Sequence, residues 1–226
     1  MAFDLAGLLT SIREHAARVL KVRLDRGPLA TVARLTEFVH MRAAYVAQTS
    51  LYGYLKTRMG TRYVELFQDP TFSQSLNRAK WPVYASCLAD LTIFAVALTR
   101  AQGGLTPEEA AALASACFDS AVDQTFEGEF AAAIAAAAKA DFARRASLTD
   151  WAAAVEGETA FARSPKDLIA HAPVSDEFKA LDEEIVTNSM RFRWRDVRDQ
   201  LRRRLDGAKV AGDWRSRPAS PPSAGA

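Results

Sequence analysis

The feature that most constrains this chain is a long stretch without proline between Pro28 and Pro70. Pro28 suits the first turn of a helix, where its missing N–H group costs nothing, and Gly60 offers a C-terminal stop. The pattern predicts one helix over residues 29–59, about 45 Å long at 1.5 Å per residue. Its apolar residues fall on two opposite sides, which is typical of a helix packed on both. We therefore expect it to be the central helix of the fold.

The rest of the chain also reads as helical, because no segment alternates polar and apolar residues in the manner of a strand. Thr106-Pro107-Glu108-Glu109 is a capping box, and similar helix starts occur at Ser147 and Ser164. The polar residues 68–80 are predicted to be a long connection. Further helices are predicted over residues 3–24, 81–99, 106–124, 127–146, 151 onwards, 164–173 and 176–205.

The sequence therefore predicts an all-α fold, a compact bundle of six to eight helices around one long central helix, with no sheet. At 226 residues it is expected to form a single domain, over residues 1–206. Gly207 is expected to end the last helix. Residues 207–226 are rich in proline, alanine and serine, and are predicted to be a disordered tail.

Residues 81–99 are the most apolar segment and include one charged residue, Asp90. The length matches a membrane span, but a carboxylate in mid-span costs about 2.5–3.5 kcal/mol on insertion scales. We therefore favour a helix buried in a soluble bundle. Cys87 and Cys117 provide no disulfide framework, and the N-terminus lacks the features of a signal peptide, so the predicted location is the cytoplasm.

Charge is segregated along the chain, although the net charge is only +2. Residues 1–100 carry 13 basic and 7 acidic residues, residues 101–190 carry 6 and 16, and residues 191–226 carry 10 and 4. Opposed blocks of this kind either face each other within the fold or mark separate surfaces for partners. The pattern excludes no function class by itself.

No nucleophile elbow, phosphate-binding loop, dinucleotide fingerprint or paired CxxC occurs, so no named reaction is indicated. Glu37 and His40 have the ExxH spacing of di-iron bundles, but such a site needs two of these motifs and the chain has one. We predict a structural polar network, with no metal ion and no cofactor. Its expected members, which double as the lining of an alternative pocket, are Glu37, His40, Tyr45, Gln48, Tyr52, Arg58 and Asp90.

Asp90 is expected to be buried and paired with a basic side chain, because an unpaired carboxylate in an apolar helix is costly. Arg42, Arg58 and His40 are the predicted partners. A functional alternative is a carboxylate of shifted pKa that lines a ligand cavity. A set of aromatic residues lies on the predicted helix 29–59 and in the segment that follows it. These residues either pack in the core or line such a pocket. The members of the set are Tyr45, Tyr52, Tyr54, Tyr63 and Trp81, with Arg58 and Arg62.

The segment 190–205 alternates seven arginines with apolar residues. Such a basic amphipathic helix is either a solvated face or a surface for a protein partner, nucleic acid or an anionic membrane. The apolar stripe shifts around the helix near Met190, so residues 176–190 are predicted to pack on the core and residues 191–205 along an edge, with Trp194 partly exposed. The predicted interaction residues are Arg191, Phe192, Arg193, Trp194, Arg195 and Arg198.

Taken together, these patterns favour a non-enzymatic cytoplasmic protein that acts through protein–protein contacts, as an adaptor, assembly factor or regulator. A homo-oligomer is compatible with the same surfaces. One alternative is a helical small-molecule-binding protein or enzyme with a pocket between helices 29–59 and 82–100. The other is a nucleic-acid binder that uses the arginine-rich C-terminal helix.

Overall fold

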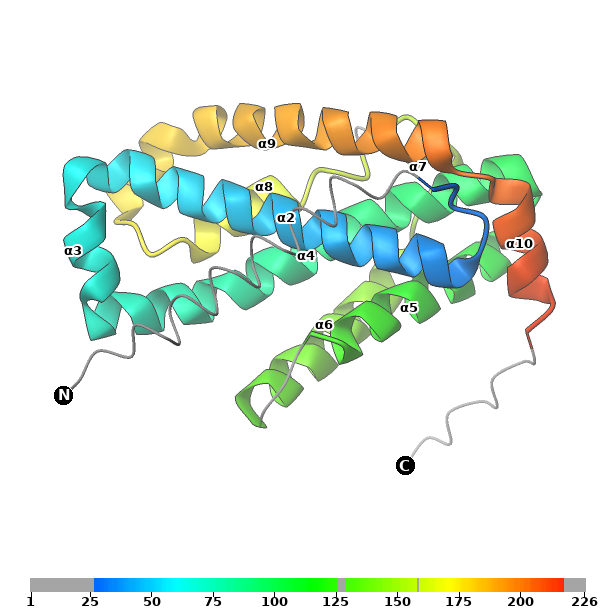
Figure 1. The fold of residues 1–226 in the computed structure, drawn as a ribbon, viewed down its shortest axis with the longest axis horizontal. Coiled ribbons are helices and arrows are strands. Elements are labelled where there is room, and N and C mark those ends of the chain that lie inside the picture. Colours follow the sequence, from blue (N-terminus) through cyan, green and yellow to red (C-terminus); the bar gives the residue numbers. More distant parts are fainter. Residues whose placement is uncertain (1–26, 126–128, 158, 218–226) are drawn as a thin grey trace.

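The computed structural model describes residues 27–125, 129–157 and 159–217, and it confirms the predicted all-α class (Figure 1). The predicted helix over residues 3–24 lies outside the described residues. Within the described ranges no strand occurs, and the single β-bridge joins Leu29 to Leu205. The elements are α2 (Val32–Met59), the short 3-10 helix η1 (Gly60–Arg62), α3 (Tyr63–Gln68), α4 (Pro70–Gly103), α5 (Pro107–Asp123), α6 (Glu129–Ser147), α7 (Trp151–Ala154), α8 (Ser164–His171), α9 (Asp176–Arg204) and α10 (Gly207–Arg215).

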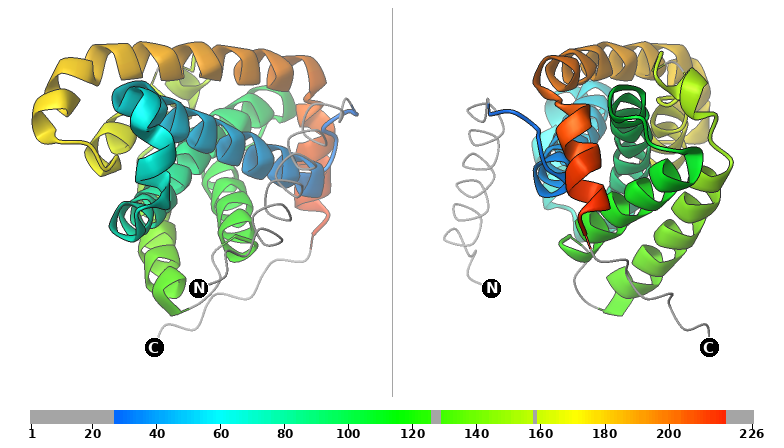
Figure 2. Two further views of the ribbon diagram at one scale, coloured as in Figure 1. Left: turned by 60° about the vertical axis from the view of Figure 1, so that its left-hand side comes forward. Right: turned by 90° about the vertical axis from the view of Figure 1, so that its right-hand side faces the viewer.

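The central helix is α4, and the prediction that residues 29–59 hold this place was wrong. Every residue from Val83 to Thr99 is buried except Ala85, because this run is apolar on all sides. Helix α2 keeps one side partly in solvent and covers one flank of α4. Figures 1 and 2 show α9 along one edge of the bundle next to α2, with α5 and α6 on the opposite side.

The first turns of α4 correct a second prediction, since the polar residues 68–80 are helical and not a connection. The side chain of Asp69 accepts a hydrogen bond from the backbone N–H of Phe72 at 2.7 Å, and Pro70 follows it in the first turn. Leu76 and Ala79, three residues apart, are buried. The capped start and the burial of Leu76 and Ala79 explain why this polar segment is helical.

By length and composition α4 could cross a membrane, and it is the one such helix in the part of the chain that the structure describes. However, 89% of its most apolar window is buried against the other helices. Burial of this extent is what the core helix of a bundle shows.

The chain after α9 corrects a third prediction, because Gly207 begins a helix and does not end the fold. The side chain of Asp206 accepts a hydrogen bond from the backbone N–H of Lys209 at 3.2 Å and caps α10. Gly103 and Gly207 let α10 approach α4 closely. A Cβ atom added at Gly103 would lie 2.6 Å from the Gly207 carbonyl oxygen. Residues 218–226 of the predicted tail lie outside the described residues.

The two ends of the described chain are joined by backbone hydrogen bonds. The N–H of Leu29 donates to the Arg204 carbonyl at 2.9 Å, and the N–H of Asp206 donates to the Leu29 carbonyl at 3.0 Å. The N–H of Val32 donates to Asp213 Oδ2 at 2.8 Å, which ties the start of α2 to α10. These contacts place the start of α2 against the end of α9 and fix the relative position of the two helices.

Candidate functional site

The structure does not bring Glu37, His40 and Asp90 together. Glu37 is exposed and forms an ion pair with Arg34 at 2.8 Å on its own helix. His40 Nδ1 lies 2.7 Å from the Tyr84 hydroxyl, which lies 3.3 Å from Thr125 Oγ1. His40 therefore links α2 to α4 and to the end of α5. Among the described residues, no group of three or more His, Cys, Asp or Glu side chains is placed to hold a metal ion.

Asp90 is fully buried and paired with a basic side chain, as predicted, but none of the predicted partners is the one it has. Its Oδ1 forms an ion pair with Nη1 of Arg145 on α6 at 2.7 Å. Its Oδ2 accepts a hydrogen bond from the backbone N–H of Ser164 at 2.8 Å. Burial raises the pKa of Asp90, and Arg145 opposes that shift. Asp90 thus joins α4, α6 and α8.

Trp194 contradicts the predicted exposed interface, because it is only 1% exposed. Its indole N–H donates to Ser164 Oγ at 3.0 Å, and its ring lies 4.7 Å from that of Phe161. Val197 and Leu201 continue the same buried side of α9. The predicted change of the buried side near Met190 is wrong, because Val186, Met190 and Trp194 lie on one continuous buried side of α9. Residues 176–190, which were predicted to pack on the core, expose Leu181 and Ile185 to solvent.

The other residues of the predicted interaction segment divide between surface and interior. Arg191, Phe192 and Arg195 are exposed, whereas Arg193 and Arg198 are half-buried. Together with Trp194, Arg191 and Arg198 line a cavity of about 590 Å³ between α9, the segment before α8 and the first turn of α8.

The predicted aromatic set does not line one pocket. Tyr52 packs against Phe67, with ring centroids 5.6 Å apart, and Tyr63 packs edge-to-face with Phe67 at 6.4 Å. Tyr45 is half-buried and packs on the core. Gln48 is half-buried on the same helix. The remaining members also lie apart from one another. Lys80 lies over the ring of Trp81, and Arg62 is exposed. Of the set, only Tyr54 and Arg58 line the same cavity.

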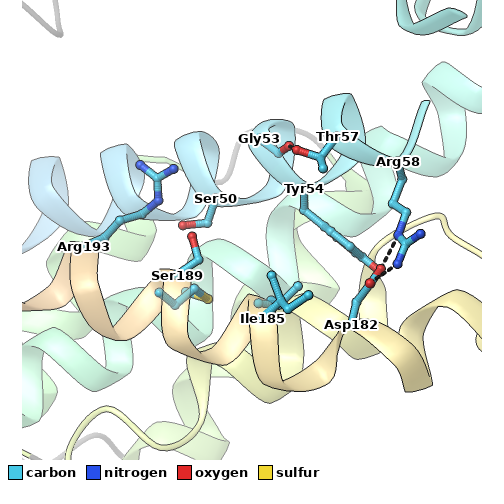
Figure 3. A pocket seen from close by; sticks show the side chains of 11 residues that line it. Ser50, Gly53, Tyr54, Thr57, Arg58, Asp182, Ile185, Ser189 and Arg193 are labelled. Carbon is cyan, nitrogen blue, oxygen red and sulfur yellow. Dashed lines mark hydrogen bonds and ion pairs between the residues drawn. The ribbon is translucent and has the colours of Figure 1, made fainter. Parts of the chain in front are cut away.

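That cavity lies between α2 and α9, not between α2 and α4 as the alternative prediction had it, and measures about 410 Å³ (Figure 3). Val186 and Met190 of α9 are buried and give it an apolar floor. Arg58 and Asp182 form a bidentate ion pair at one end. The full lining is Ser50, Gly53, Tyr54, Thr57, Arg58, Asp182, Ile185, Val186, Ser189, Met190 and Arg193.

Three buried polar atoms of this lining have no hydrogen-bond partner among the described residues: Ser50 Oγ, the Tyr54 hydroxyl oxygen and Arg193 Nε. In Figure 3, Arg193, Ser50 and Ser189 lie at one end, and Tyr54 extends toward Asp182 at the other. Burial raises the pKa of Tyr54, and the positive charge of Arg58 opposes that shift. The cavity therefore has a cationic end, an apolar middle and an ion-paired end.

Sequence reasoning named Tyr54 and Arg58 but missed Ser50, Asp182 and Arg193 as cavity residues. Arg58 and Asp182 are 124 residues apart in the chain, so no local pattern could have paired them. The polar Ser50 on an apolar side of α2 was the one signal present in the sequence.

The outer side of α9 carries exposed apolar residues at helical spacing. Phe178 is 46% exposed, Leu181 72%, Ile185 70% and Phe192 70%. At 100° per residue they fall within about 60° of one another on the helical wheel. We call these four residues the outer stripe. Arg58 lies over the ring of Phe178 and Arg195 over that of Phe192. A row of exposed apolar side chains on one helix side indicates an interaction surface.

No protein-family model, curated protein or solved structure matches this chain.

Proposed function

We propose that this chain is a non-enzymatic protein of the cytoplasm that acts through protein–protein contact, as an adaptor, assembly factor or regulator, and that the outer stripe of α9 is its contact surface. The observation that carries the proposal is the exposure of three large apolar side chains, Leu181, Ile185 and Phe192, to 70% or more. Cys87 and Cys117 are free thiols, both buried, which is compatible with a reducing compartment.

The occupant we propose for the stripe is the same stripe of a second copy, in antiparallel orientation. Residues 176–190 of α9 carry five acidic residues and one lysine, whereas residues 191–204 carry seven arginines and two aspartates. An antiparallel pair sets the acidic half of each helix on the basic half of the other, and a parallel pair does not.

The spacing of the residues supports one two-fold axis. Leu181 and Phe192 are equally far along the helix from the point between residues 186 and 187, so each Leu181 meets the partner's Phe192. The midpoint between Glu184 and Arg191 lies within one residue of the same point, and both residues flank the stripe on the same side. The same axis therefore brings Glu184 to the partner's Arg191, as charged residues flank the seam of an antiparallel helix pair.

The test is the molar mass in solution, measured by light scattering after gel filtration over a range of concentrations. Wild type is expected to be a dimer, and Leu181→Glu is expected to be a monomer with an unchanged circular dichroism spectrum. Leu148→Glu is the matched control, because Leu148 is 80% exposed but lies outside the stripe. A wild type that stays monomeric at every concentration contradicts the proposal, and so does a Leu148→Glu variant that dissociates equally.

A charge swap tests the orientation. Glu184→Arg and Arg191→Glu should each weaken the dimer, because each sets like charges face to face. The double variant should restore it. If the double variant is weaker than both single variants, the antiparallel arrangement is wrong.

A second candidate, nucleic-acid binding, is favoured by the alignment of Arg191, Arg195 and Arg202, which are exposed and lie along one line of α9. A row of arginines can contact successive phosphates. Retention on heparin that falls steeply with salt, and that is lost in Arg195→Ala but kept in Leu181→Glu, would favour this candidate over the dimer.

A further inference from the structure

We propose that the cavity between α2 and α9 binds a small organic monocarboxylate with an apolar body, held at its carboxylate by Arg193 and Ser50. This inference does not rest on the proposed function, although Ile185 belongs to both surfaces: it stands at the rim of the cavity, whereas Phe178, Leu181 and Phe192 of the outer stripe do not line it.

The first argument is the concentration of unpartnered polar atoms. Buried polar groups nearly always have a partner, and each exception calls for an explanation. Ser50 is only 6% exposed, and its hydroxyl has no partner among the described residues. Arg193 Nε is in the same situation, while the Tyr54 hydroxyl has the guanidinium of Arg58 beside it, and all three residues line this one cavity. A bound molecule with polar groups at both ends accounts for all three.

The second argument is the charge at the two ends. At the end formed with Ser50, Arg193 extends from α9 toward α2 (Figure 3), and no acidic side chain in the described part of the chain pairs with it. Its Nη2 lies 3.7 Å from where a Cβ atom of residue 53 would be, so the guanidinium reaches α2 at Gly53. At the other end, Asp182 neutralises Arg58. One uncompensated guanidinium matches one carboxylate, which it binds with two parallel hydrogen bonds.

The third argument is the shape and polarity of the middle. Val186 and Met190 form the floor, and Ile185 stands at the rim. Positions 50 and 58 of α2 are about 12 Å apart at 1.5 Å per residue, so the ligand is longer than an inorganic anion. The volume of about 410 Å³ lies in the range of small-molecule sites. The ligand class is thus a carboxylate, then an apolar chain or ring, then a group that hydrogen-bonds to Tyr54.

The test uses isothermal titration calorimetry on the full chain with octanoate and 3-phenylpropionate. Acetate, which lacks the apolar body, and octanol, which lacks the charge, are the comparison probes. We expect binding of at least one of the two amphipathic acids, with a negative heat-capacity change from apolar burial, and much weaker binding of acetate and octanol. No measurable binding of either amphipathic acid overturns the proposal.

Arg193→Met keeps the apolar stem and removes the charge, and it is expected to weaken binding at least about tenfold. Arg195→Met is the matched control, because Arg195 is an exposed arginine on the same helix that does not line the cavity. Equal binding by Arg193→Met and wild type overturns the assignment, and so does an equal loss in Arg195→Met.

Ser50→Val gives a readout that does not depend on how Arg193→Met folds. Because the Ser50 hydroxyl has no partner to lose, this variant should keep the wild-type melting temperature or exceed it, while its added methyl group narrows the carboxylate end and weakens binding. A lower melting temperature with unchanged binding means that Ser50 has only a structural role, which overturns the proposal.

Discussion

Replacing Asp90 by alanine tests the buried ion pair at the centre of the bundle. The substitution removes the carboxylate that lies 2.7 Å from Nη1 of Arg145 and accepts a hydrogen bond from the N–H of Ser164. Both contacts are made at a residue with 0% exposure. Three helices, α4, α6 and α8, lose their shared connection in one step.

The size of the effect follows from what is left behind. The Ser164 N–H, in a residue with no exposed surface, loses its acceptor, which costs about 1–3 kcal/mol. Breaking a fully buried ion pair costs about 3–5 kcal/mol, but Arg145 is 21% exposed and its Nη2 still donates to the Ala160 carbonyl. The cost of breaking the ion pair is therefore below the value for a fully buried pair, and we expect Asp90→Ala to lower the free energy of unfolding by about 3 kcal/mol in total. For a domain of this size, that corresponds to a melting temperature lower by about 6–12 °C.

The assay is thermal and urea unfolding followed by circular dichroism. Asp123→Ala is the matched control, since the ion pair of Asp123 with Lys139 also reaches α6 but Asp123 is 66% exposed. An exposed pair of this kind contributes about 0–1 kcal/mol. If Asp90→Ala and Asp123→Ala melt at the same temperature, the buried connection does not stabilise the fold and the reasoning is refuted.

The pH dependence of Asp90→Asn tests the direction of the pKa shift. Because burial raises the pKa of Asp90 in the folded state, the folded protein binds this proton more tightly than the unfolded chain does. Asp90 therefore contributes more stability as the pH falls from neutral toward the ordinary pKa of about 3.9. The difference in melting temperature between wild type and Asp90→Asn, taken as wild type minus variant, should grow between pH 7 and pH 4.5. A shrinking difference would show that Arg145 outweighs burial.

Two further predictions concern packing. Gly103→Ala should lower the free energy of unfolding by about 1–3 kcal/mol, because the added Cβ atom would lie 2.5 Å from the Cβ atom of Ala211. Gly212→Ala adds a Cβ atom with no other atom within 4 Å, so it should leave the stability unchanged or raise it. Melting curves of the two variants test both expectations. Burial raises the pKa of Cys117 to about 11 and that of Cys87 well above its usual value, so neither thiol should react with a disulfide reagent at pH 8 until the protein is unfolded. Prompt labelling of the native protein would contradict the buried positions.

Much of the fold could be predicted from the sequence, because helix starts are local signals. The capping box at Thr106 and Glu109 forms as predicted, with the Glu109 N–H donating to Thr106 Oγ1 and the Thr106 N–H to Glu109 Oε2. The error over residues 68–80 has a physical cause, since the polar composition there reflects the exposed side of α4 and hides the buried Leu76 and Ala79.

The candidate site was less predictable because its parts meet through tertiary packing. Helical spacing puts Arg145 on the side of Phe142 and its neighbour Arg144 on the other, but no local pattern indicates that Arg145 reaches Asp90 on α4. A helical wheel correctly gave α9 two apolar sides, but it carries no information on which side faces the core. That side is set by Phe161 and Ser164, which Trp194 contacts.

The pairing of Leu29 with Leu205 has a consequence for how the chain folds during synthesis. The contact cannot form until Asp206 has been made, and at 5–20 residues per second a ribosome takes roughly 9–35 s to travel from Leu29 to Leu205. After the apolar run Val83–Thr99 has been made, α8 follows only from Ser164 and α10 only from Gly207, and both pack on α4 in the finished fold. The nascent chain is then a natural client for chaperones, and a stalled or truncated copy that ends before α8 leaves open to solvent the sides of α4 that α8 and α10 cover.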